Sequence, residues 1–490
     1  MKWELARNSL HTSRLTQVTN LGEELLRNAT IKVLVVADSS VGLNPNFGVG
    51  KAIEAIRAHA PSYAKILVDL ARRDQQGNHL DTFAVNPTAN QATLIAKYRG
   101  LRFDHAESGD RTSDPALQII SQYDQIWVFG FAPVGDRTPA VDDDEVRALT
   151  RWMDERRGGV FATGIAGTLG AALAARIPRV STMRRWTRGP AEARAASFTL
   201  TSLPHPVLCG GSDFGLIDVL PDHSHEGWVH EDAEVDLSRT TLTGNAEYPS
   251  LGAVRETPHA ISWAKGLPDP TASASELAEA ERWMALLGVY NGHASGVGRV
   301  VVDSTWHHWM DINLLALEAA AATATVDLPT LSDKRARNAA LEVIANYDKI
   351  VRYFINIAIW LAPPTKQHWM LHAATGWAVT QPRSKQDLDE RTPTEMAGQL
   401  AAETLARQVG PCQLDEWLHL LSPGPKPRPH WPPAPLTWPR RFELLGSLVK
   451  ELLALSPEAQ SHGLRPLSSA CSPHRESSAA GSDATDPARA

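Results

Sequence analysis

Two adjacent histidines, His307 and His308, are the residues of this 490-residue chain best placed to do chemistry. They follow the run Gly-Arg-Val-Val-Val-Asp at 298–303, which is typical of a buried strand, and Trp306 directly precedes them. Imidazole groups exchange protons near neutral pH, so either histidine could act as a general acid or base. Side chains alternate along an extended chain, so we expect one histidine to face a ligand crevice and the other to face away.

A second group of such side chains, Asp222, His223, His225 and Glu226, falls in a segment whose composition predicts a loop. Imidazole and carboxylate groups can bind a metal ion, and a glutamate near a histidine can act as a base. The segment completes no ligand spacing of a known metal site, and the hydrogen-bonding side chains of an ordinary loop are an equal alternative. We predict catalytic roles for His225 and Glu226, substrate contacts for Asp222 and His223, and no metal.

Two glycine-containing segments could bind an anion through backbone N–H groups. Residues 47–52 lack the spacing of a P-loop and the Ser or Thr that should follow its lysine, so we interpret them as a turn into a helix. The segment from Gly164 to Thr168 predicts the strand–turn–helix of a nucleophile elbow, but Ile165 and Ala166 at its tip cannot attack a substrate. Gly164 and Thr168 are therefore predicted to contact substrate through the helix N-terminus, with a purely structural turn as the alternative.

A basic segment, 176–188, contains Arg184, Arg185 and Trp186. Guanidinium groups beside an aromatic ring can hold a carboxylate, a phosphate or a sugar, although a solvated surface explains the same residues. With Trp306, these three complete the predicted substrate-binding set. Cys209 precedes two glycines, but nothing in its surroundings indicates a reactive thiolate, so we interpret it as an ordinary thiol.

The elements that position these residues follow an alternating strand and helix pattern. Buried strands are predicted at 31–38, 64–70, 125–130 and 160–163, and helices at 47–60, 142–157 and 168–176. The alternation implies a parallel sheet covered by helices on both faces, with ligands bound at the carboxyl ends of the strands. Residues 180–290 show a less regular pattern. One strand is predicted within them, at 259–264, and another after them, at 298–303.

Helical patterns dominate from about residue 331, with helices predicted at 343–361, 366–379, 393–409 and 440–455. Eight prolines at 422–439 predict a stiff connector, and the last 35 residues hold too few bulky apolar side chains to offset the entropy of ordering. The predicted organisation is an N-terminal extension (1–28), an α/β domain (29–328), a helical domain (329–421), a proline-rich linker (422–439), a helix (440–455) and a disordered tail (456–490).

Composition limits the function classes without naming one. A hydrophobic fraction of 43% and a charged fraction of 21% are typical of a folded protein, and a net charge of −7 argues against sequence-independent nucleic-acid binding. Three cysteines are too few for a disulfide-stapled fold or a cysteine-rich zinc module. Charges interrupt both the N-terminus and the most apolar helix. We expect a cytoplasmic protein without nucleic-acid partner, membrane or cofactor, and leave homo-oligomerisation open.

The segment 298–307, Gly-Arg-Val-Val-Val-Asp-Ser-Thr-Trp-His, resembles the strand-to-histidine segment of the ThuA-like trehalose-utilisation proteins. These belong to the class I glutamine-amidotransferase-like superfamily. Residues 261–264 resemble the strand that precedes this segment, and 123–127 and 157–161 resemble middle strands. The resemblance covers roughly 30–315.

What the resemblance implies is a flavodoxin-like sheet and a role on oxidised sugar intermediates. The family histidine maps to His307, or to His308 by a one-residue slip. The chain departs from the superfamily at the elbow, where amidotransferases place cysteine and this sequence has Ala166. Glutamine hydrolysis is therefore not expected, and activity would depend on the 307–308 pair and the 222–226 loop.

Three hypotheses follow. The first is an enzyme that acts on a small polar, sugar-derived substrate by His/Glu acid–base chemistry. The second is a non-catalytic binding or scaffold protein on an amidotransferase-like fold that lost its nucleophile. The third is a metal-dependent hydrolase that would use His223, His225 and an aspartate, Asp222 or Asp303.

Overall fold

The computed structural model describes most of the chain in separate stretches. They are residues 23–38, 48–73, 79–85, 94–96, 101–130, 142–164, 173–185, 198–202, 204–210, 215–220, 228–231, 234–252, 254–266, 274, 283–381, 391–421 and 437–454. Of the connector predicted at 422–439, residues 422–436 fall outside them, and so does the predicted tail, 456–490; the helix predicted from 440 begins at Trp438.

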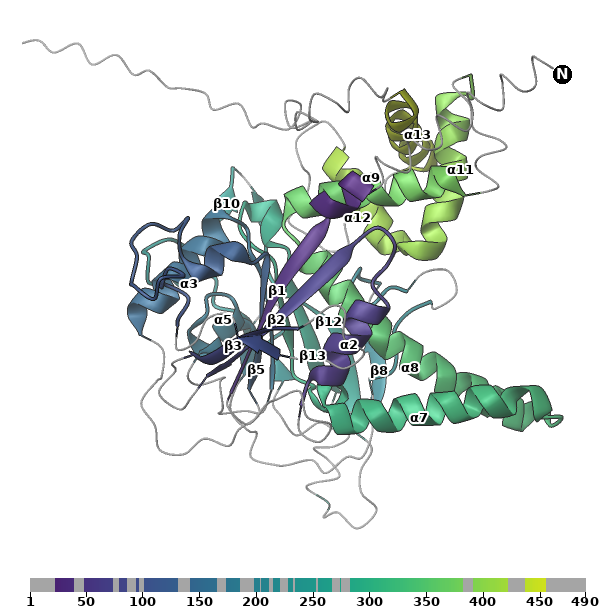
Figure 1. Ribbon diagram of the computed structural model, residues 1–490, viewed down its shortest axis with the longest axis horizontal. Helices are drawn as coiled ribbons and strands as arrows, with labels where there is room; N and C mark the ends of the chain where they lie inside the picture. Colours follow the sequence, from purple (N-terminus) through teal and green to yellow (C-terminus); the bar gives the residue numbers. More distant parts are fainter. Residues whose placement is uncertain are drawn as a thin grey trace, which may run out of the picture.

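A ten-stranded sheet forms the centre of the described part of the molecule (Figure 1). Five neighbouring strands are parallel: β2 (Lys65–Arg73), β1 (Thr30–Asp38), β5 (Gln125–Gly130), β6 (Gly159–Gly164) and β14 (Val300–Asp303). Antiparallel strands extend both edges: β3 (His79–Val85) and β4 (Leu94–Ala96) beyond β2, and β13 (Trp283–Tyr290), β12 (His259–Gly266) and β8 (Phe198–Ser202) beyond β14. The predicted α/β, flavodoxin-like sheet is confirmed, with antiparallel additions at its edges.

Alternation along the central strands sends side chains into two cores. In β1, Val33 and Val35 belong to one hydrophobic cluster, and Leu34 and Val36 belong to the other. The first cluster includes residues of α2 (Gly50–Ala58) and α8 (Lys334–Leu361). The second includes residues of α3 (Asp143–Glu155) and α5 (Val180–Met183). Helices therefore cover both faces of the sheet, as predicted.

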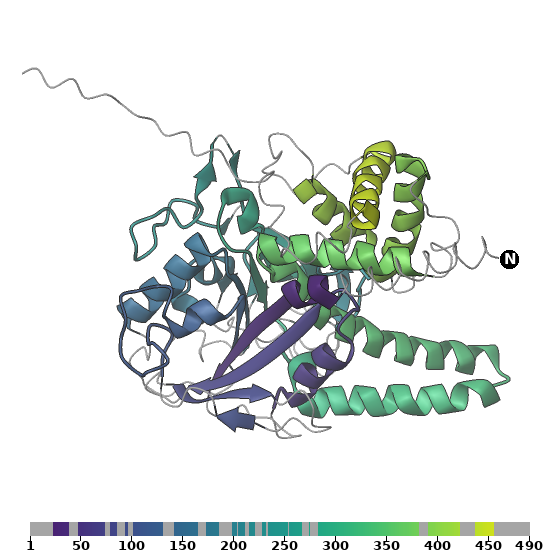
Figure 2. The same ribbon diagram turned by 45° about the horizontal axis from the view of Figure 1, so that its top comes forward.

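The helices after β14 divide into a projecting pair and a compact group. α7 (Asp311–Asp327) and the first half of α8 run side by side and project from the body, as Figure 2 shows. The second half of α8 lies against the sheet, and its buried residues share the first core with β1. The compact group is α9 (Pro364–Thr380), α11 (Thr394–Gln408), α12 (Pro411–Leu421) and α13 (Trp438–Ala454).

Short elements complete the described part. They are the two-stranded pairs β7 (Arg184–Arg185) with β9 (Trp228–Val229) and β10 (Ser250–Leu251) with β11 (Val254–Arg255), and the 3₁₀-helices η1 (Ile119–Gln122), η2 (Ala174–Arg176), η4 (Gly292–Ser295), η5 (His307–Trp309) and η6 (Leu328–Thr330).

Most predicted elements appear close to their expected positions, and α8 begins earlier than its predicted start at 343. The elements that were not predicted include α7 and β13, together with α12, β3, β4 and β8. α7 is apolar on every side and β13 is buried from Ala285 onward, so neither sequence shows the polar–apolar contrast on which period analysis depends. The predicted helix at 168–176 falls largely outside the described residues, and its last turn is η2.

In the part of the chain that the structure describes, none of the helices combines the length and the apolar character that crossing a bilayer requires.

Candidate functional site

The carboxyl ends of β6 and β14 lie side by side at the carboxyl edge of the sheet, the edge at which parallel α/β sheets bind their ligands. The hydroxyl of Thr163 donates a hydrogen bond to the carbonyl of Thr305, with the oxygens 2.6 Å apart, and so ties the two strand ends together. The buried guanidinium of Arg184 donates to the carbonyls of Gly164 and Asp303 at 2.6 and 2.7 Å. Arg184 thus links the backbones at the ends of β6 and β14. Its sequence context did not indicate this structural role. Its predicted contact with substrate stays a prediction.

Gly164 itself has a backbone conformation that favours glycine, with φ of +132°. A Cβ atom at this position would lie 2.1 Å from the carbonyl oxygen of Gly130 on β5. The end of β6 is therefore packed backbone to backbone against its neighbour. This packing is a structural reason for glycine at position 164 that does not involve a substrate. The predicted role of Gly164 in substrate binding stays a prediction.

The carboxylate of Asp303 organises the turn that follows β14. Asp303 is fully buried, and its Oδ1 accepts a hydrogen bond of 2.7 Å from the amide of Thr305. Its Oδ2 accepts a bond of 2.7 Å from the hydroxyl of Tyr353 on α8. Burial, together with the neighbouring carboxylate, raises the pKa of Tyr353 well above its usual value, so the phenol stays protonated and donates.

The two histidines of the turn lie in different surroundings. His308 is completely buried, with its Nε2 at 3.6 Å from Oδ2 of Asp303 and its ring stacked against Phe354. His307 is half-buried, and its ring stacks on that of Trp306 with the ring centres 3.9 Å apart. The pair lies on η5 rather than on a strand. His307 is therefore the one that solvent or a ligand can reach.

The N-terminus of α2, which follows β1, is occupied by a carboxylate of the chain itself. Asp311 accepts a hydrogen bond of 2.7 Å from the amide of Lys51, and its own amide donates to the carbonyl of Gly48 at 2.8 Å. Burial raises the pKa of Asp311 to about 6, although the amides of Lys51 and Gly50 favour the charged form. The described part of the segment, 48–52, is thus a turn into a helix, as we interpreted it, and its anion position is filled by Asp311.

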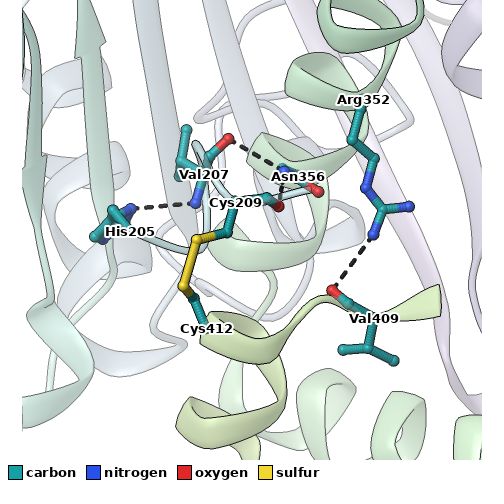
Figure 3. Close-up of a disulfide and its surroundings, with 7 residues drawn as sticks. All are labelled: His205, Val207, Cys209, Arg352, Asn356, Val409 and Cys412. Atoms are coloured by element: carbon teal, nitrogen blue, oxygen red, sulfur yellow. Dashed lines mark hydrogen bonds between the residues drawn. A yellow bond between two sulfur atoms is a disulfide. The ribbon is translucent and has the colours of Figure 1, made fainter. Parts of the chain in front are cut away.

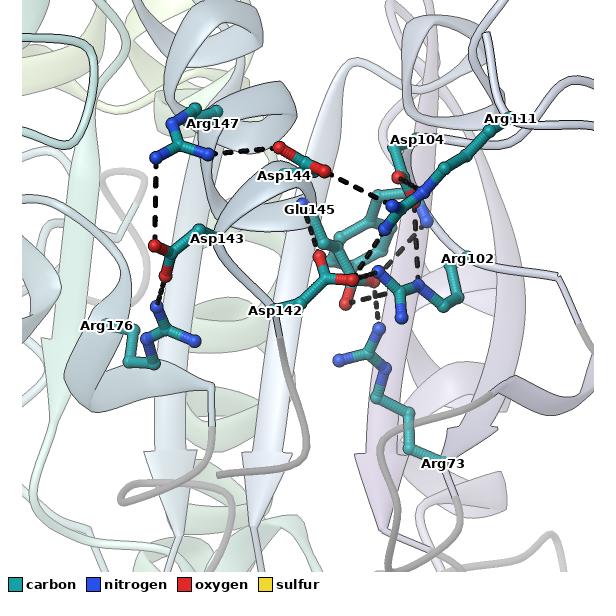
Figure 4. A network of polar contacts seen from close by, with 11 residues as sticks. Arg73, Arg102, Asp104, Arg111, Asp142, Asp143, Asp144, Glu145, Arg147 and Arg176 are labelled. Carbon is teal, nitrogen blue, oxygen red and sulfur yellow. Dashed lines mark hydrogen bonds and ion pairs between the residues drawn. The ribbon is translucent and has the colours of Figure 1, made fainter. Parts of the chain in front are cut away.

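The N-terminus of α3 is occupied in the same way, within a network of ion pairs (Figure 4). Asp142 caps the helix by accepting a bond of 3.0 Å from the amide of Glu145, and Arg102 and Arg111 both pair with its carboxylate. Partial burial opposes ionisation, but these donors hold the pKa of Asp142 well below its usual range. Deeper in the network, Arg73 at the end of β2 pairs with Glu145, and both are buried.

Several predicted site residues lie outside the described residues. They are Asp222, His223, His225 and Glu226 of the predicted loop, with Thr168 and Trp186. Arg185 is described only as backbone, paired with Trp228 in β7 and β9. Among the described residues, there is no group of three or more histidine, cysteine or acidic side chains arranged to hold a metal ion.

Cys209 forms a disulfide with Cys412, so our interpretation of Cys209 as an ordinary thiol is wrong (Figure 3). The two residues are 203 positions apart in sequence, and their Cα atoms are 6.3 Å apart. Cys209 belongs to the loop after β8 and Cys412 to α12. No local pattern marks such a pair, because the fold alone brings the two segments together.

Arg299, in the segment 298–307, lies at the opposite, amino edge of the sheet. It is buried, forms an ion pair with Glu416 of α12, and donates a bond of 2.8 Å to the carbonyl of Trp360 on α8. Its guanidinium also lies over the ring of Trp360, 4.5 Å from the centre. The arginine of this segment therefore joins the sheet to the helical region.

No protein-family model, no curated protein and no solved structure matches this chain.

Proposed function

We propose that this protein binds a small polar, sugar-derived molecule at the carboxyl edge of its sheet, and that His307 acts there as a general acid or base. The observation that carries the proposal is the contrast within the histidine pair. His308 is sealed beside Asp303 and Tyr353, whereas His307 is half-buried at the end of the same fixed turn. A group that must exchange protons with a ligand needs access and a fixed position, and His307 has both.

The chemistry of the ligand is supported by what the edge already contains. Asp311 occupies the N-terminus of α2, and Asp142 occupies that of α3. A phosphate at either helix would meet a carboxylate and be repelled. The arrangement favours a ligand recognised through hydroxyl or other neutral polar groups, as a sugar derivative is.

Trp306 contributes by orienting the imidazole. Its ring is almost completely buried, with 5% of its surface exposed, and the ring of His307 lies on it at an interplanar angle of 28°. A buried ring beneath the imidazole fixes its plane, which leaves fewer orientations to be lost when a ligand binds.

The proposal also includes predicted catalytic residues that lie outside the described part of the chain. His225 and Glu226 would supply the second proton-transfer group, and the likeness to the ThuA-like proteins supports a sugar-derived substrate. The cytoplasmic location remains the expectation from composition. We expect no cofactor, because acid–base chemistry on such a substrate requires none.

Binding can be tested by calorimetric titration of the full chain with a neutral sugar, a sugar acid, a keto-sugar and inorganic phosphate. We expect at least one of the three sugar compounds to bind, phosphate not to bind, and His307→Ala to weaken sugar binding by about tenfold or more, the effect of losing one good polar contact. His59→Ala is the matched control, because His59 is an exposed histidine at the far end of α2. Binding that is equally strong in both variants, or no sugar binding at all, would remove the basis of the proposal.

A non-catalytic binding protein is the second candidate, and the lack of a nucleophile favours it. Ile165 and Ala166, at the tip of the predicted elbow, carry no nucleophilic side chain, so we do not expect covalent catalysis there. The two candidates separate in one measurement, which follows a bound sugar compound by NMR over several hours. Conversion that disappears in His307→Ala supports the enzyme, and an unchanged spectrum of the bound compound supports the binding protein.

A further inference from the structure

The disulfide between Cys209 and Cys412 connects the sheet region to the helical region. Cys209 lies in the loop that follows the edge strand β8 and is buried, with 8% of its surface exposed. Cys412 is the second residue of α12 and is half-buried. Among the described residues this disulfide is the one covalent link between the two segments, and it adds to the non-covalent contacts of α12 with the sheet region.

The two cysteines are held together by contacts that do not involve sulfur. Asn356 of α8 donates hydrogen bonds of 2.9 and 3.2 Å to the carbonyls of Cys209 and Val207 (Figure 3). On the other side, Arg352 of α8 donates a bond of 2.7 Å to the carbonyl of Gln408, just before α12. Both cysteine segments are therefore anchored to the same helix, and the two thiols stay close when the bond between them is absent.

The backbones also meet directly. Gly410, the residue before α12, has φ of +85°, and a Cβ atom there would lie 2.8 Å from the carbonyl oxygen of Gly210. One turn after Cys412, Glu416 pairs with the buried Arg299. The docking of α12 thus has ionic and packing components besides the covalent one.

We propose that Cys209 and Cys412 form a reversible redox lock, which tightens the docking of α12 when oxidised and loosens it when reduced. The lock is independent of the ligand site proposed above. A low-molecular-weight disulfide such as glutathione disulfide is the oxidant, and reduced glutathione is the reductant.

The exchange balances in two steps. The thiolate of Cys412, the more exposed of the pair, attacks glutathione disulfide, forms a mixed disulfide and releases one glutathione thiolate. The thiolate of Cys209 then attacks the Cys412 sulfur of the mixed disulfide and releases the second. Two protein thiols are oxidised, one glutathione disulfide is reduced, and the two protons of the protein thiols pass to the released glutathiones.

The number of free thiols tests the lock directly, because the chain has three cysteines. The full chain is equilibrated with either reduced or oxidised glutathione, denatured, alkylated with N-ethylmaleimide and weighed intact. We expect three labels after reduction. After oxidation we expect the loss of two hydrogens that marks the disulfide, no label on Cys209 or Cys412, and either one label or one glutathione on Cys471. Three labels in both samples would show that the bond does not form, and one label in both would show that the bond is not reversible. Either result overturns the proposal.

Hydrogen exchange then tests what the bond does. We expect the amides of α12 to exchange about tenfold faster or more in the reduced protein, since a cross-link limits local opening. Cys412→Ser should exchange like the reduced protein in both buffers, and Cys471→Ser, the matched control, should keep the redox response. A change in labelling without a difference in hydrogen exchange would mean that the bond forms but does not tighten the docking of α12, which would overturn the proposal.

Discussion

Removing the hydroxyl of Tyr353 should lower the free energy of unfolding by about 2 kcal/mol. The hydroxyl donates a bond of 2.7 Å to Asp303, and both residues are fully buried. A hydrogen bond to a charged group contributes roughly 1.5–3 kcal/mol. Tyr353→Phe leaves Oδ2 of Asp303 without this donor, while Oδ1 keeps its bond from the amide of Thr305. The carboxylate therefore stays partly satisfied, which places the loss inside that range and below the ~3–5 kcal/mol of a broken buried ion pair.

Urea denaturation at pH 7, followed by tryptophan fluorescence, measures this loss. Tyr347→Phe is the matched control, because Tyr347 is a half-buried tyrosine two turns earlier on α8. We expect it to change the free energy of unfolding by less than about 0.5 kcal/mol. An equal effect of the two substitutions would refute the reasoning, because the bond to Asp303 would then contribute no more than an ordinary tyrosine hydroxyl.

The site offers a second readout of the same perturbation. If the network around Asp303 positions η5, Tyr353→Phe should also weaken binding at His307, although Tyr353 makes no contact with that ring among those described. A stability loss with unchanged ligand affinity would separate the structural role of the network from its proposed positioning role.

Two further predictions concern buried charges at the amino edge. Burial raises the pKa of Glu256 to about 7, so this carboxyl is protonated in the folded protein at a pH at which it ionises in the unfolded chain. The free energy of unfolding should therefore fall by about 3 kcal/mol between pH 4.5 and pH 8, and Glu256→Gln should remove this part of the pH dependence. Urea denaturation across this pH range measures both. Identical pH profiles for the parent protein and Glu256→Gln would contradict the prediction. Arg299→Met should destabilise by ~3–5 kcal/mol, because it leaves Glu416 partly buried without its partner. In a double-mutant cycle, Glu416→Gln should cause much less further loss in Arg299→Met than in the parent protein; strictly additive losses would show that the pair is not coupled.

The sequence was sufficient for the parallel part of the sheet because its strands are short apolar runs bounded by turn residues. Residues 125–130 and 160–163 became β5 and β6 with little change of boundary. Pattern analysis failed where an element has no polar face. α7 carries only three charged residues, Asp311, Glu318 and Asp327, and its apolar residues lie on every side.

The site was only partly predictable for a different reason. His307 and His308 could be located as a pair, but which of them is buried depends on Tyr353, which comes from α8 and is distant in sequence. Asp311 as the cap of α2, and Glu416 as the partner of Arg299, are pairings across 260 and 117 positions. Contacts of this kind arise from topology, and spacing along one sequence contains no trace of them.

The position of α8 also has a consequence for how this protein could have been assembled from parts. From Ile350 to Leu361 the helix fills the same core as Val33, Trp127 and Phe161 of the sheet. A fragment ending at residue 328 would expose that apolar face to water, so we expect it to aggregate rather than fold. A chain that lacked the helical region would therefore need a different covering for this face of the sheet, and we expect the two parts to fold as one unit.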